Sequence, residues 1–499
     1  MNYTAVRNNV PVPIESIPIL EYETFLEQNI ILAGKPDNHC VNYYGHRAGN
    51  KIRLICCMAS DMEMMIYVSS SLINSSKPLP SFTRHRHSFE KFEREIAENF
   101  GISYIDHPWL KPVRYAFDRH DRKQEISGYP FFRFHGDETH EVGVGPIHAG
   151  IIEPGHFRFM CNGEQILHLE IQLGYQHRGI ERLFIEKDNL LSRTVLAESI
   201  AGDTVAGHTA AFVNLWEGLC GYQSDEGSKL TRTLGLELER VAVHTGDMSA
   251  LCTDIAWQLG SSVYGRLRTP VINFFQSWCG NRLAKGLIRA GKNNYPLTGE
   301  LKEELLKIFE EFLPAFHQVN KEASRLPSVL SRFERTGILT GHQAADIGAV
   351  GMTARMCGIR RDIRLSHPHD LYPVLGHQPV LKHHGDVYSR FQIRREEIKQ
   401  SIGYIKKIME NIPEVNHDGR NWKSEPMAGQ FSVSLVEGWR GEICHCAITG
   451  ENGRLVHYKI KDPSFHNWLA LALAVRNNEI SDFPVCNKSF NLSYCGHDL

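Results

Sequence analysis

The period of the hydrophobic pattern changes along this chain, and the change restricts the folds that the chain can adopt. Between residues 40 and 70 apolar and polar side chains alternate, which predicts β-strands with a turn at residues 48–50. Residues 87–102 place their phenylalanines on one helical face and their charges on the other. From about residue 180 the apolar spacing is mainly helical. We therefore expect an α+β fold in which a small N-terminal α/β domain precedes a large, mainly helical domain with peripheral β-hairpins.

A polar, aromatic-rich stretch without a sustained period separates the two parts. We expect a first domain over residues 1–125, a linker over 126–142 and a second domain over 143–499. Turns at Gly163 and at the asparagine-glycine pair of residues 452–453 predict β-hairpins in the second domain. Long helical segments, the last of them the final helix, are expected at residues 180–215, 230–260, 300–320, 385–412 and 466–475.

The charge balance gives no reason to expect a nucleic acid partner, because 55 basic and 57 acidic side chains are dispersed and the formal net charge is -2. No window holds about 18 uninterrupted apolar residues, and the first residues lack the basic start and apolar run of a signal peptide. We therefore expect a cytoplasmic chain without a transmembrane segment. Twelve cysteines in such a chain indicate reduced thiols or metal ligands rather than disulfides.

Two of the cysteines lie on a predicted strand with the sequence Cys-His-Cys. Cys444 and Cys446 should point to one face of this strand and His445 to the other. Two thiolates on one face could hold a soft metal, but a tetrahedral site needs about four ligands. Buried free thiols explain the same pattern.

A second group of polar residues recurs with helical spacing. Arg240, His244 and Asp247 should lie on one face of a helix that is otherwise suited to burial. Such groups must be paired, or must line an interface or a cavity, so a functional site and a structural network are both possible. The segment GYQHRGIE also places His177 and Arg178 beside a glycine, which alone indicates little.

These segments, taken in order, give the chain a resemblance to one family. It resembles the large subunit of formate hydrogenlyase and related energy-converting hydrogenases, which is similar to the quinone-site subunit of respiratory complex I. Residues 89–108 resemble the smaller complex I subunit that is fused at the front of this branch. The motifs that carry the resemblance are GPIHAGIIEPGHFRF, GYQHRGIERL, LELERVAVHTGD, MTARMCGIRRDIRLSHP, GDVYSRFQIRREEIKQ, VEGWRGEI and DPSFHNW with DFPVCNKSFNLSY.

The resemblance implies a nickel-iron site that this sequence lacks. Members of the family bind the two metals with four thiolates, from one CxxC motif early in the large domain and one near its end. Here Ala201 and Thr204 take the first two ligand positions, and Ser493 and Gly496 take the last two. Cys495 falls one residue short of the final position, which should direct its sulfur elsewhere. We therefore expect no metal and no hydrogen activation.

The resemblance to complex I implies a quinone site instead, but its two ligand positions are also changed. Pro154 takes the place of the quinone-binding histidine, and the partner tyrosine falls near Gly202. Polar groups nevertheless remain nearby, and Glu153 matches the glutamate that relays protons in hydrogenases. These groups could carry protons, or could hydrogen-bond one another across an idle pocket. The candidate catalytic residues are Glu153, His156, Tyr175, Asp203 and His208.

Three further residues match positions that lie near an iron-sulfur cluster in the relatives, namely His177, Arg178 and His244. The cluster is held by a separate small subunit, and this chain has no ferredoxin-like cysteine spacing. The resemblance therefore implies that the chain itself binds no cofactor, with quinone as a potential exception. It implies an iron-sulfur partner, antiporter-like membrane-arm subunits, and a peripheral position on the cytoplasmic face of the inner membrane.

The function implied is that of a peripheral-arm subunit in a complex that couples electron transfer to ion translocation. Electrons would be delivered at a cavity formed by residues 150–157, 175–178 and 200–208. No glycine fingerprint for NAD binding is present. One alternative is a non-catalytic scaffold that docks the iron-sulfur subunit to the membrane arm. Another is a new metal site built from Cys444, Cys446, Cys495 and His497.

Overall fold

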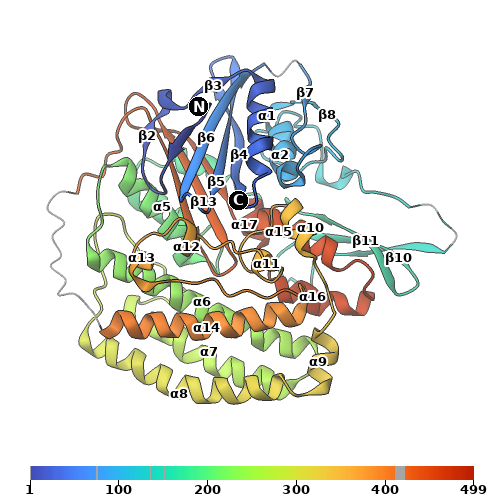
Figure 1. Ribbon diagram of the computed structural model, residues 1–499, viewed down its shortest axis with the longest axis vertical. Helices are drawn as coiled ribbons and strands as arrows, with labels where there is room; N and C mark the ends of the chain where they lie inside the picture. Colours follow the sequence, from blue (N-terminus) through green and yellow to red (C-terminus); the bar gives the residue numbers. More distant parts are fainter. Residues whose placement is uncertain (1, 75–76, 135, 137, 151, 411–421) are drawn as a thin grey trace.

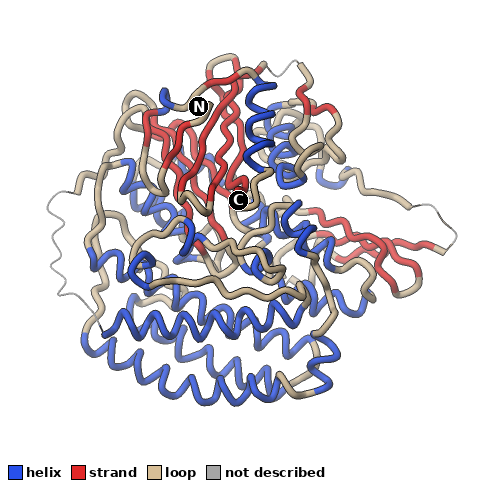
Figure 2. The backbone as a smooth tube through the Cα atoms, in the orientation of Figure 1, coloured by secondary structure: helices blue, strands red, loops and turns tan. Residues whose placement is uncertain are grey.

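The structure is a computed structural model that describes the whole chain except residues 1, 75–76, 135, 137, 151 and 411–421. It confirms the expected α+β class, because a strand-rich N-terminal part is followed by a larger, mainly helical part (Figures 1 and 2). Figure 1 shows the N-terminal sheet at one end of the molecule and the longest helices at the other.

The N-terminal part is built on a five-stranded sheet in the order β1-β6-β5-β4, with β3 parallel to β6. The expected turn near residues 48–50 is confirmed, because Ala48 pairs with Lys51 across β4 and β5. Helices α1 and α2 pack against this sheet through a shared apolar core. The elements are β1 Thr4–Val6, β3 Ile19–Leu20, α1 Tyr22–Ala33, β4 Asn38–Ala48, β5 Lys51–Ser60, β6 Met65–Ile73, β7 Leu79–Pro80, α2 Glu90–Phe100 and β8 Tyr104–Ile105.

A second sheet, in the order β14-β13-β12-β2, is covered on both faces. Its strands are β2 Val12–Pro13, β12 Gln430–Glu437, β13 Glu442–Thr449 and β14 Leu455–Lys461, so the hairpin predicted at residues 452–453 is confirmed. Cys444 and Cys446 share an apolar core with the N-terminal sheet. Ile443 and Ala447, in the alternate register, share a core with the helices. Because side chains alternate along a strand, His445 points toward the helical side.

A third sheet forms the hairpin that projects at one side of the molecule in Figure 1. Its strands are β9 Thr139–Val144, β10 His156–Asn162 and β11 Gln165–Gln172. The predicted turn at Gly163 is confirmed, and the positive φ of 55° at this residue suits glycine.

The helical part surrounds a large core that also includes β13 and β14. Figure 1 shows α6, α14, α7 and α8 stacked in layers below the second sheet. The helices are α3 Ile180–Glu186, α4 Leu190–Ala197, α5 Val205–Leu219, α6 Glu226–Asp254, α7 Gln258–Cys279, α8 Gly299–Ala323, α9 Pro327–Phe333, α10 Gly341–Asp346, α11 Met352–Arg355, α12 Ile363–Ser366, α13 Tyr372–Leu375, α14 Val387–Glu410, α15 Ser464–Ala474, α16 Phe483–Phe490 and α17 Tyr494–Asp498.

The helix predictions differ from the structure in two places. The segment 180–215 forms three helices, since the Asn189 side chain caps α4 by accepting the Ser192 N–H at 2.8 Å. The helix over residues 466–475 exists but is not the last, because α16 and α17 follow it. These two helices have 8 and 5 residues and are too short to show a clear period.

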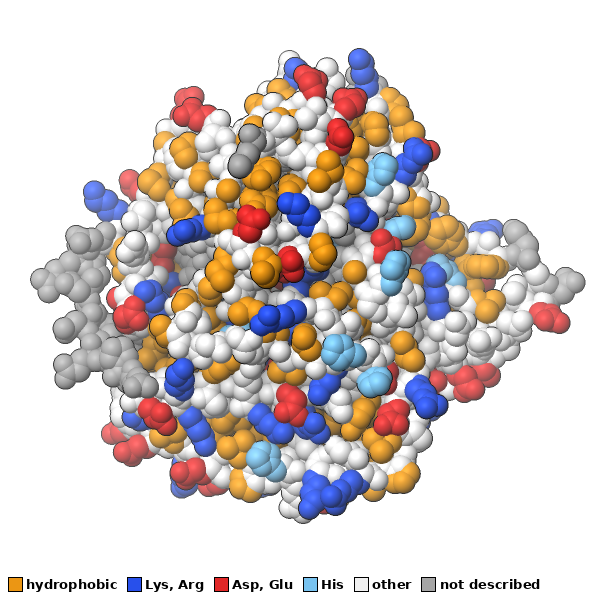
Figure 3. Space-filling view, viewed as in Figure 1, with side chains coloured by type: hydrophobic (Ala, Val, Ile, Leu, Met, Phe, Trp, Pro, Cys, Tyr) orange, Lys and Arg blue, Asp and Glu red, His pale blue; other side chains and the backbone are white. Residues whose placement is uncertain are grey.

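The described helices include none that is long and apolar enough to span a bilayer. Acidic and basic side chains are intermixed on the face shown in Figure 3.

Candidate functional site

An arginine in the turn between β12 and β13 connects the first altered ligand motif, residues 201–204, to the segment just before the second, residues 493–496. Arg440 donates to both carboxylate oxygens of Asp203 at 2.6 Å and to Thr204 Oγ1 at 3.0 Å. Its Nε donates to the carbonyl oxygen of Asn491 at 2.6 Å. The indole N–H of Trp439 donates to the Asp203 carbonyl oxygen at 2.8 Å. A buried cation therefore lies against the place of the first motif.

The backbone of this turn is tightly packed, which fixes the position of the Arg440 backbone. Gly438 and Gly441 exchange two backbone hydrogen bonds, at 2.9 and 3.1 Å. A Cβ atom on Gly351 would lie 2.2 Å from Gly441 Cα, so the close approach of the two segments requires glycine.

A row of buried side chains begins at the second altered motif and runs through the second sheet. Gly496 packs against Asp462, whose Oδ2 lies 3.0 Å from His208 Nε2. His208 Nδ1 lies 3.1 Å from His445 Nε2, and His445 Nδ1 lies 2.8 Å from the Tyr458 hydroxyl. We call Asp462, His208, His445 and Tyr458 the histidine row; each is 0% exposed.

The ionised carboxylate of Asp462, at one end of the histidine row, determines the direction in which each hydrogen bond of the row is donated. Burial opposes ionisation of Asp462, but contacts with His208 and Arg440 hold the pKa of this carboxyl below its usual value. The carboxylate accepts from His208 Nε2–H, so His208 Nδ1 is an acceptor for His445 Nε2–H. His445 Nδ1 then accepts from the Tyr458 hydroxyl. Burial lowers the pKa of His445 well below its usual value, which keeps this imidazole neutral.

Cys495 lies beside the loop that precedes β10. Its Sγ is 3.5 Å from Ser493 Oγ, and this hydroxyl caps α17 by accepting the Gly496 N–H at 2.9 Å. Burial raises the pKa of Cys495 to about 11, and the adjacent Glu153 carboxylate adds to the rise. Glu153 is thus placed next to the second altered motif.

The residues at the four ligand positions do not fit a nickel-iron centre. Ala201 offers a methyl group, Thr204 and Ser493 offer hydroxyls, and Gly496 offers no side chain, whereas these metals require soft sulfur donors. A Cβ atom on Gly496 would lie 2.7 Å from Asp462, and the Arg440 cation contacts Thr204. We therefore assign no reaction step to such a centre.

Two candidate catalytic residues, His156 and Tyr175, contact residues outside the altered motifs. The Nδ1 atom of His156 is 3.0 Å from the carbonyl oxygen of Gly145, and its ring packs against Phe131 at 5.3 Å. The Tyr175 hydroxyl donates to Gln172 Oε1 at 2.8 Å. The structure thus brings Glu153, Asp203 and His208 to the altered motifs. His156 and Tyr175 instead contact Gly145, directly after β9, and Gln172, the last residue of β11. Of the expected cavity, Ile151 lies outside the described residues.

A small cavity of about 30 Å³ is lined in part by Gly202 and Asp203 of the first altered motif. Asp203 and Arg268 line it together with Glu239 of α6. Glu239 accepts the N–H groups of Ala206 and Gly207 at 2.7 and 3.2 Å, at the start of α5. Burial, with a smaller effect from Asp203, raises the pKa of Glu239 to about 8.

The three residues expected near a partner cluster fall into two places. His177 Nδ1 lies 2.8 Å from the Asp498 carbonyl oxygen, and Arg178 donates to the carbonyl oxygens of Ile200 and Cys495. His244 instead lies inside the helical core on α6, with Nε2 2.8 Å from Glu397 Oε2. The structure therefore joins His177 and Arg178 but does not bring His244 to them.

The cysteines and histidine proposed for a new metal site are also divided. Cys444 Sγ and Cys446 Sγ lie 3.7 Å apart on the face of β13 toward the N-terminal sheet. Cys495 lies beside Glu153, and His497 Nδ1 lies 2.9 Å from Asp498 Oδ1. Within the described ranges, histidine, cysteine and acidic side chains form no group of three or more that could hold a metal ion.

The partners of His208 could not be predicted from the sequence. The strand pattern of CHC already separates His445 from the two cysteines, but it does not show which helix His445 faces. No sequence motif marks Asp462 or Tyr458. Asp462 lies 254 residues from His208 in the sequence and Tyr458 lies 13 residues from His445, so both contacts are formed only by the fold.

Comparison with known proteins identifies several relatives. Residues 259–428 match the family model described as the 49 kDa subunit of respiratory-chain NADH dehydrogenase. Hydrogenase-4 component G of Escherichia coli K12 is 25% identical over 446 residues, covering 86% of this chain and 77% of that protein. Formate hydrogenlyase subunit 5 of the same organism is 26% identical over 455 residues, covering 85% and 77%. The C/D subunit of NADH-quinone oxidoreductase from Phocaeicola vulgatus is 26% identical over 416 residues, covering 76% and 79%.

Proposed function

We propose a function from the premise that this chain is a homologue of hydrogenase-4 component G, of formate hydrogenlyase subunit 5 and of NADH-quinone oxidoreductase C/D subunits, as its motifs indicate. It is a peripheral-arm subunit of a membrane-associated redox complex, on the cytoplasmic face. It receives electrons from an iron-sulfur partner subunit and delivers them to a quinone-like or other small acceptor. The transfer is coupled to ion translocation by antiporter-like membrane subunits, and it involves no nickel-iron centre in this chain.

The observation that carries the proposal is the histidine row. It begins at Asp462, which packs against Gly496 at a former ligand position, and it ends at Tyr458 inside the second sheet. Each bond in the row joins a nitrogen or oxygen donor to an acceptor at 2.8–3.1 Å. A proton from the Tyr458 hydroxyl can be passed through His445 and His208 to Asp462, which leaves both imidazoles in the opposite tautomer, so the row can move a proton toward Asp462 without a large motion.

Glu153 supports proton movement from the other side of α17. It contacts Cys495, and Cys495 contacts Ser493, whose hydroxyl accepts the Gly496 N–H. Glu153 and Asp462 therefore flank the start of the same short helix. Because Glu153 is partly exposed, it can exchange protons with solvent, whereas Asp462 cannot.

Exposed apolar side chains around His177 and Arg178 support a docking site for the electron-donating partner. Phe117 is 66% exposed and packs on the His177 ring at 5.4 Å. Val195 of α4 is 48% exposed, and its carbonyl oxygen accepts from the hydroxyl of Ser199, whose own carbonyl oxygen accepts from Arg178. Apolar groups left in solvent near a cationic side chain are typical of a surface that a partner covers.

The test uses the purified complex, with its iron-sulfur partner, and follows oxidation of the reduced cluster by added quinones. His208→Ala and Glu153→Gln should slow the oxidation, while Glu186→Gln on the surface of α3 should not. The expected loss is about 100-fold for His208→Ala, as for removal of a positioned proton carrier.

A second function, a non-catalytic scaffold, is favoured by the Arg440–Asp203 ion pair, because it closes the first altered motif with protein groups. If the chain is a scaffold, either no added acceptor oxidises the cluster, or the cluster is oxidised at the wild-type rate in complexes that carry either variant. Either result would reject the proposed redox role.

A further inference from the structure

A cavity of about 160 Å³ lies where α2 of the N-terminal part meets β11 and α15. These three elements are labelled in Figure 1. None of the residues that line the cavity belongs to either altered motif, so it is separate from the candidate site. Part of its wall is aromatic, formed by Trp109, Tyr129, Phe132 and Trp468.

The two carboxyl groups that line this cavity are both matched by cations of the protein. Glu90 accepts from Arg94 and, at 2.6 Å, from the indole N–H of Trp109. Glu170 accepts from Lys111 and, at 2.8 Å, from a backbone N–H. Each carboxylate is thus paired and hydrogen-bonded within the fold, so neither requires a cationic ligand.

Two cationic side chains of the cavity have no carboxylate partner. Lys91, on α2, is partly buried and forms no hydrogen bond or ion pair within the part of the chain that the structure describes. Its Nζ atom lies 5.7 Å from the centre of the Phe465 ring. Arg476, just after α15, is exposed, and its guanidinium donates to His168 Nδ1 at 3.1 Å. Lys91 and Arg476 therefore leave two uncompensated positive charges at the cavity when both are protonated.

The imidazole beside Arg476 adds a further donor without a partner. Because His168 Nδ1 accepts from Arg476, its Nε2 atom carries the proton. This Nε2 is buried and has no hydrogen-bond partner among the described residues. The His168 ring packs edge-on against Phe132 at 5.5 Å. A positive end of a dipole thus lies in the same wall as the two unpaired cations, and an anion is the complementary ligand.

The surroundings of Lys91 leave its charge poorly compensated. Burial lowers the pKa of Lys91 to about 7. The carboxylates of Glu90 and Asp498 offset this effect only in part, and Arg94 and Arg114 repel the charge. An anion in contact with the ammonium group favours its charged form, so a bound anion supplies what the fold does not.

We propose that this cavity binds an organic acid made of one aromatic ring with a carboxylate or phosphate group. The anionic group binds Lys91, the ring lies against the aromatic wall, and the exposed guanidinium of Arg476 adds to the attraction. The proposal goes beyond the redox function, because it uses no residue of the candidate site.

The volume of the cavity limits the ligand to one ring. A protein cavity of about 150 Å³ holds one benzene molecule, which is close to the 160 Å³ found here. Larger organic ligands occupy pockets of about 300 Å³ or more, so a nucleotide does not fit. A bound acid would connect α2 of the N-terminal part to β11 and α15 of the second part.

Calorimetric titration of the full chain with benzoate tests the proposal. Benzoate should bind with a dissociation constant of about 1 mM or tighter, which is attainable for a ligand of about nine heavy atoms. Acetate, which has the charge without the ring, and benzyl alcohol, which has the ring without the charge, should bind at least about tenfold more weakly. Phenyl phosphate in place of benzoate decides between the two anionic groups.

Two results of this titration would overturn the proposal. One is that neither benzoate nor phenyl phosphate binds at about 10 mM, which is far above the expected dissociation constant. The other is that benzyl alcohol binds as tightly as benzoate, because the cations would then play no part.

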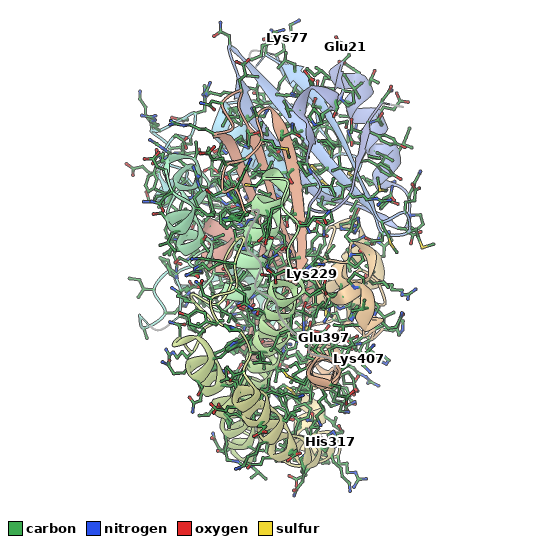
Figure 4. All side chains as sticks on the ribbon, turned by 90° about the vertical axis from the view of Figure 1, so that its left-hand side faces the viewer. Glu21, Lys77, Lys229, His317, Glu397 and Lys407 are labelled. Carbon is green, nitrogen blue, oxygen red and sulfur yellow. The ribbon has the colours of Figure 1, made fainter. Side chains whose placement is uncertain are left out.

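Variants of the unpaired cations locate the bound acid. Lys91→Met keeps an apolar stem but removes the charge, and it should weaken benzoate binding at least about tenfold, as for a lost charge-assisted hydrogen bond. Arg476→Gln, at an exposed position, should weaken it by a smaller factor. The control is Lys229→Met on α6, a position labelled in Figure 4. Wild-type affinity in a folded Lys91→Met chain would overturn the proposal.

A chemical readout requires no variant. The wild-type chain is acetylated with a limiting amount of acetic anhydride, and the modified lysines are quantified by mass spectrometry. At a benzoate concentration of about ten times the dissociation constant, acetylation of Lys91 should slow about tenfold, since about one cavity in ten stays free. Acetylation of Lys229 should not change. Equal rates at Lys91 with and without bound benzoate would place the acid elsewhere and overturn the proposal.

Discussion

Glu239 shows at the scale of one residue how burial sets the protonation of a side chain. Its pKa is raised from 4.5 to about 8, so the folded chain keeps a proton that the unfolded chain releases at neutral pH. The stability that this proton gives is fully present below about pH 4.5 and is lost as the pH rises through about 8.

Glu239→Gln should therefore make the free energy of unfolding less dependent on pH between 5 and 9. Glutamine keeps one oxygen that can accept one of the N–H groups of Ala206 and Gly207, and it has no proton to lose. The free energy of unfolding of the wild type, relative to that of the variant, should change by about 3–5 kcal/mol over this pH range. This is the free energy that corresponds to the shift in the pKa of Glu239. Urea unfolding at several pH values measures it, and parallel curves would show that Glu239 titrates normally.

The contact between Cys495 and Glu153 makes a second prediction at this scale. A thiol with a pKa of about 11 has little thiolate at pH 8, so Cys495 should react with iodoacetamide about 100-fold more slowly than a free cysteine. Glu153→Gln removes the nearby negative charge and should speed the reaction, which mass spectrometry of the labelled peptide follows. Glu186→Gln is the control. An equal rate in the three proteins would mean that Glu153 does not contact the thiol.

At the scale of an element, α17 contains Gly496, a position at which the resemblance implies a metal ligand. A Cβ atom on Gly496 would lie 2.7 Å from Asp462, whereas one on Gly202, in the other altered motif, meets nothing within 4 Å. Gly496→Ala should lower the free energy of unfolding by about 1–3 kcal/mol because of overpacking. Gly202→Ala should change it by less than about 1 kcal/mol, the cost of a tolerated substitution. Equal effects in urea unfolding would contradict the packing at α17.

The strand β14 supplies the end of the histidine row, and its hydroxyl is testable on its own. Tyr458→Phe keeps the stack on Phe184 but leaves His445 Nδ1 buried without a donor, which should cost about 1–3 kcal/mol. The Tyr264 hydroxyl is also buried but has no partner among the described residues. Tyr264→Phe should therefore be neutral or stabilising. If the two variants behave alike in urea unfolding, the Tyr458 hydroxyl donates to nothing.

Elements with a clear period were predictable, and contacts between them were not. The alternation of residues 40–70 and the turns at Gly163 and residues 452–453 specified their strands, because local sterics decide such patterns. Short helices such as α17 were missed, since about one turn shows no period. The buried position of Arg440 beside Asp203 depends on a glycine contact between α11 and the β12–β13 turn, which no local pattern contains.

At the scale of the whole molecule, the position of the second sheet determines which buried side chains meet. It is packed between the N-terminal sheet and the helices, so β13 places two thiols on one side and His445 on the other. This arrangement brings His445 of β13 to His208 of α5, and Asp462 to the former ligand position at Gly496. A methyl group, hydroxyls and a nearby cation lie where the resemblance implies four thiolates, so these positions offer no soft donors for nickel and iron.

The most direct test of this account is made on the purified complex, in which nickel content and hydrogen uptake are measured together with oxidation of the partner cluster by quinone. We predict nickel far below one atom per complex, no hydrogen uptake, and oxidation of the cluster that depends on His208. Stoichiometric nickel with hydrogen uptake would contradict the account.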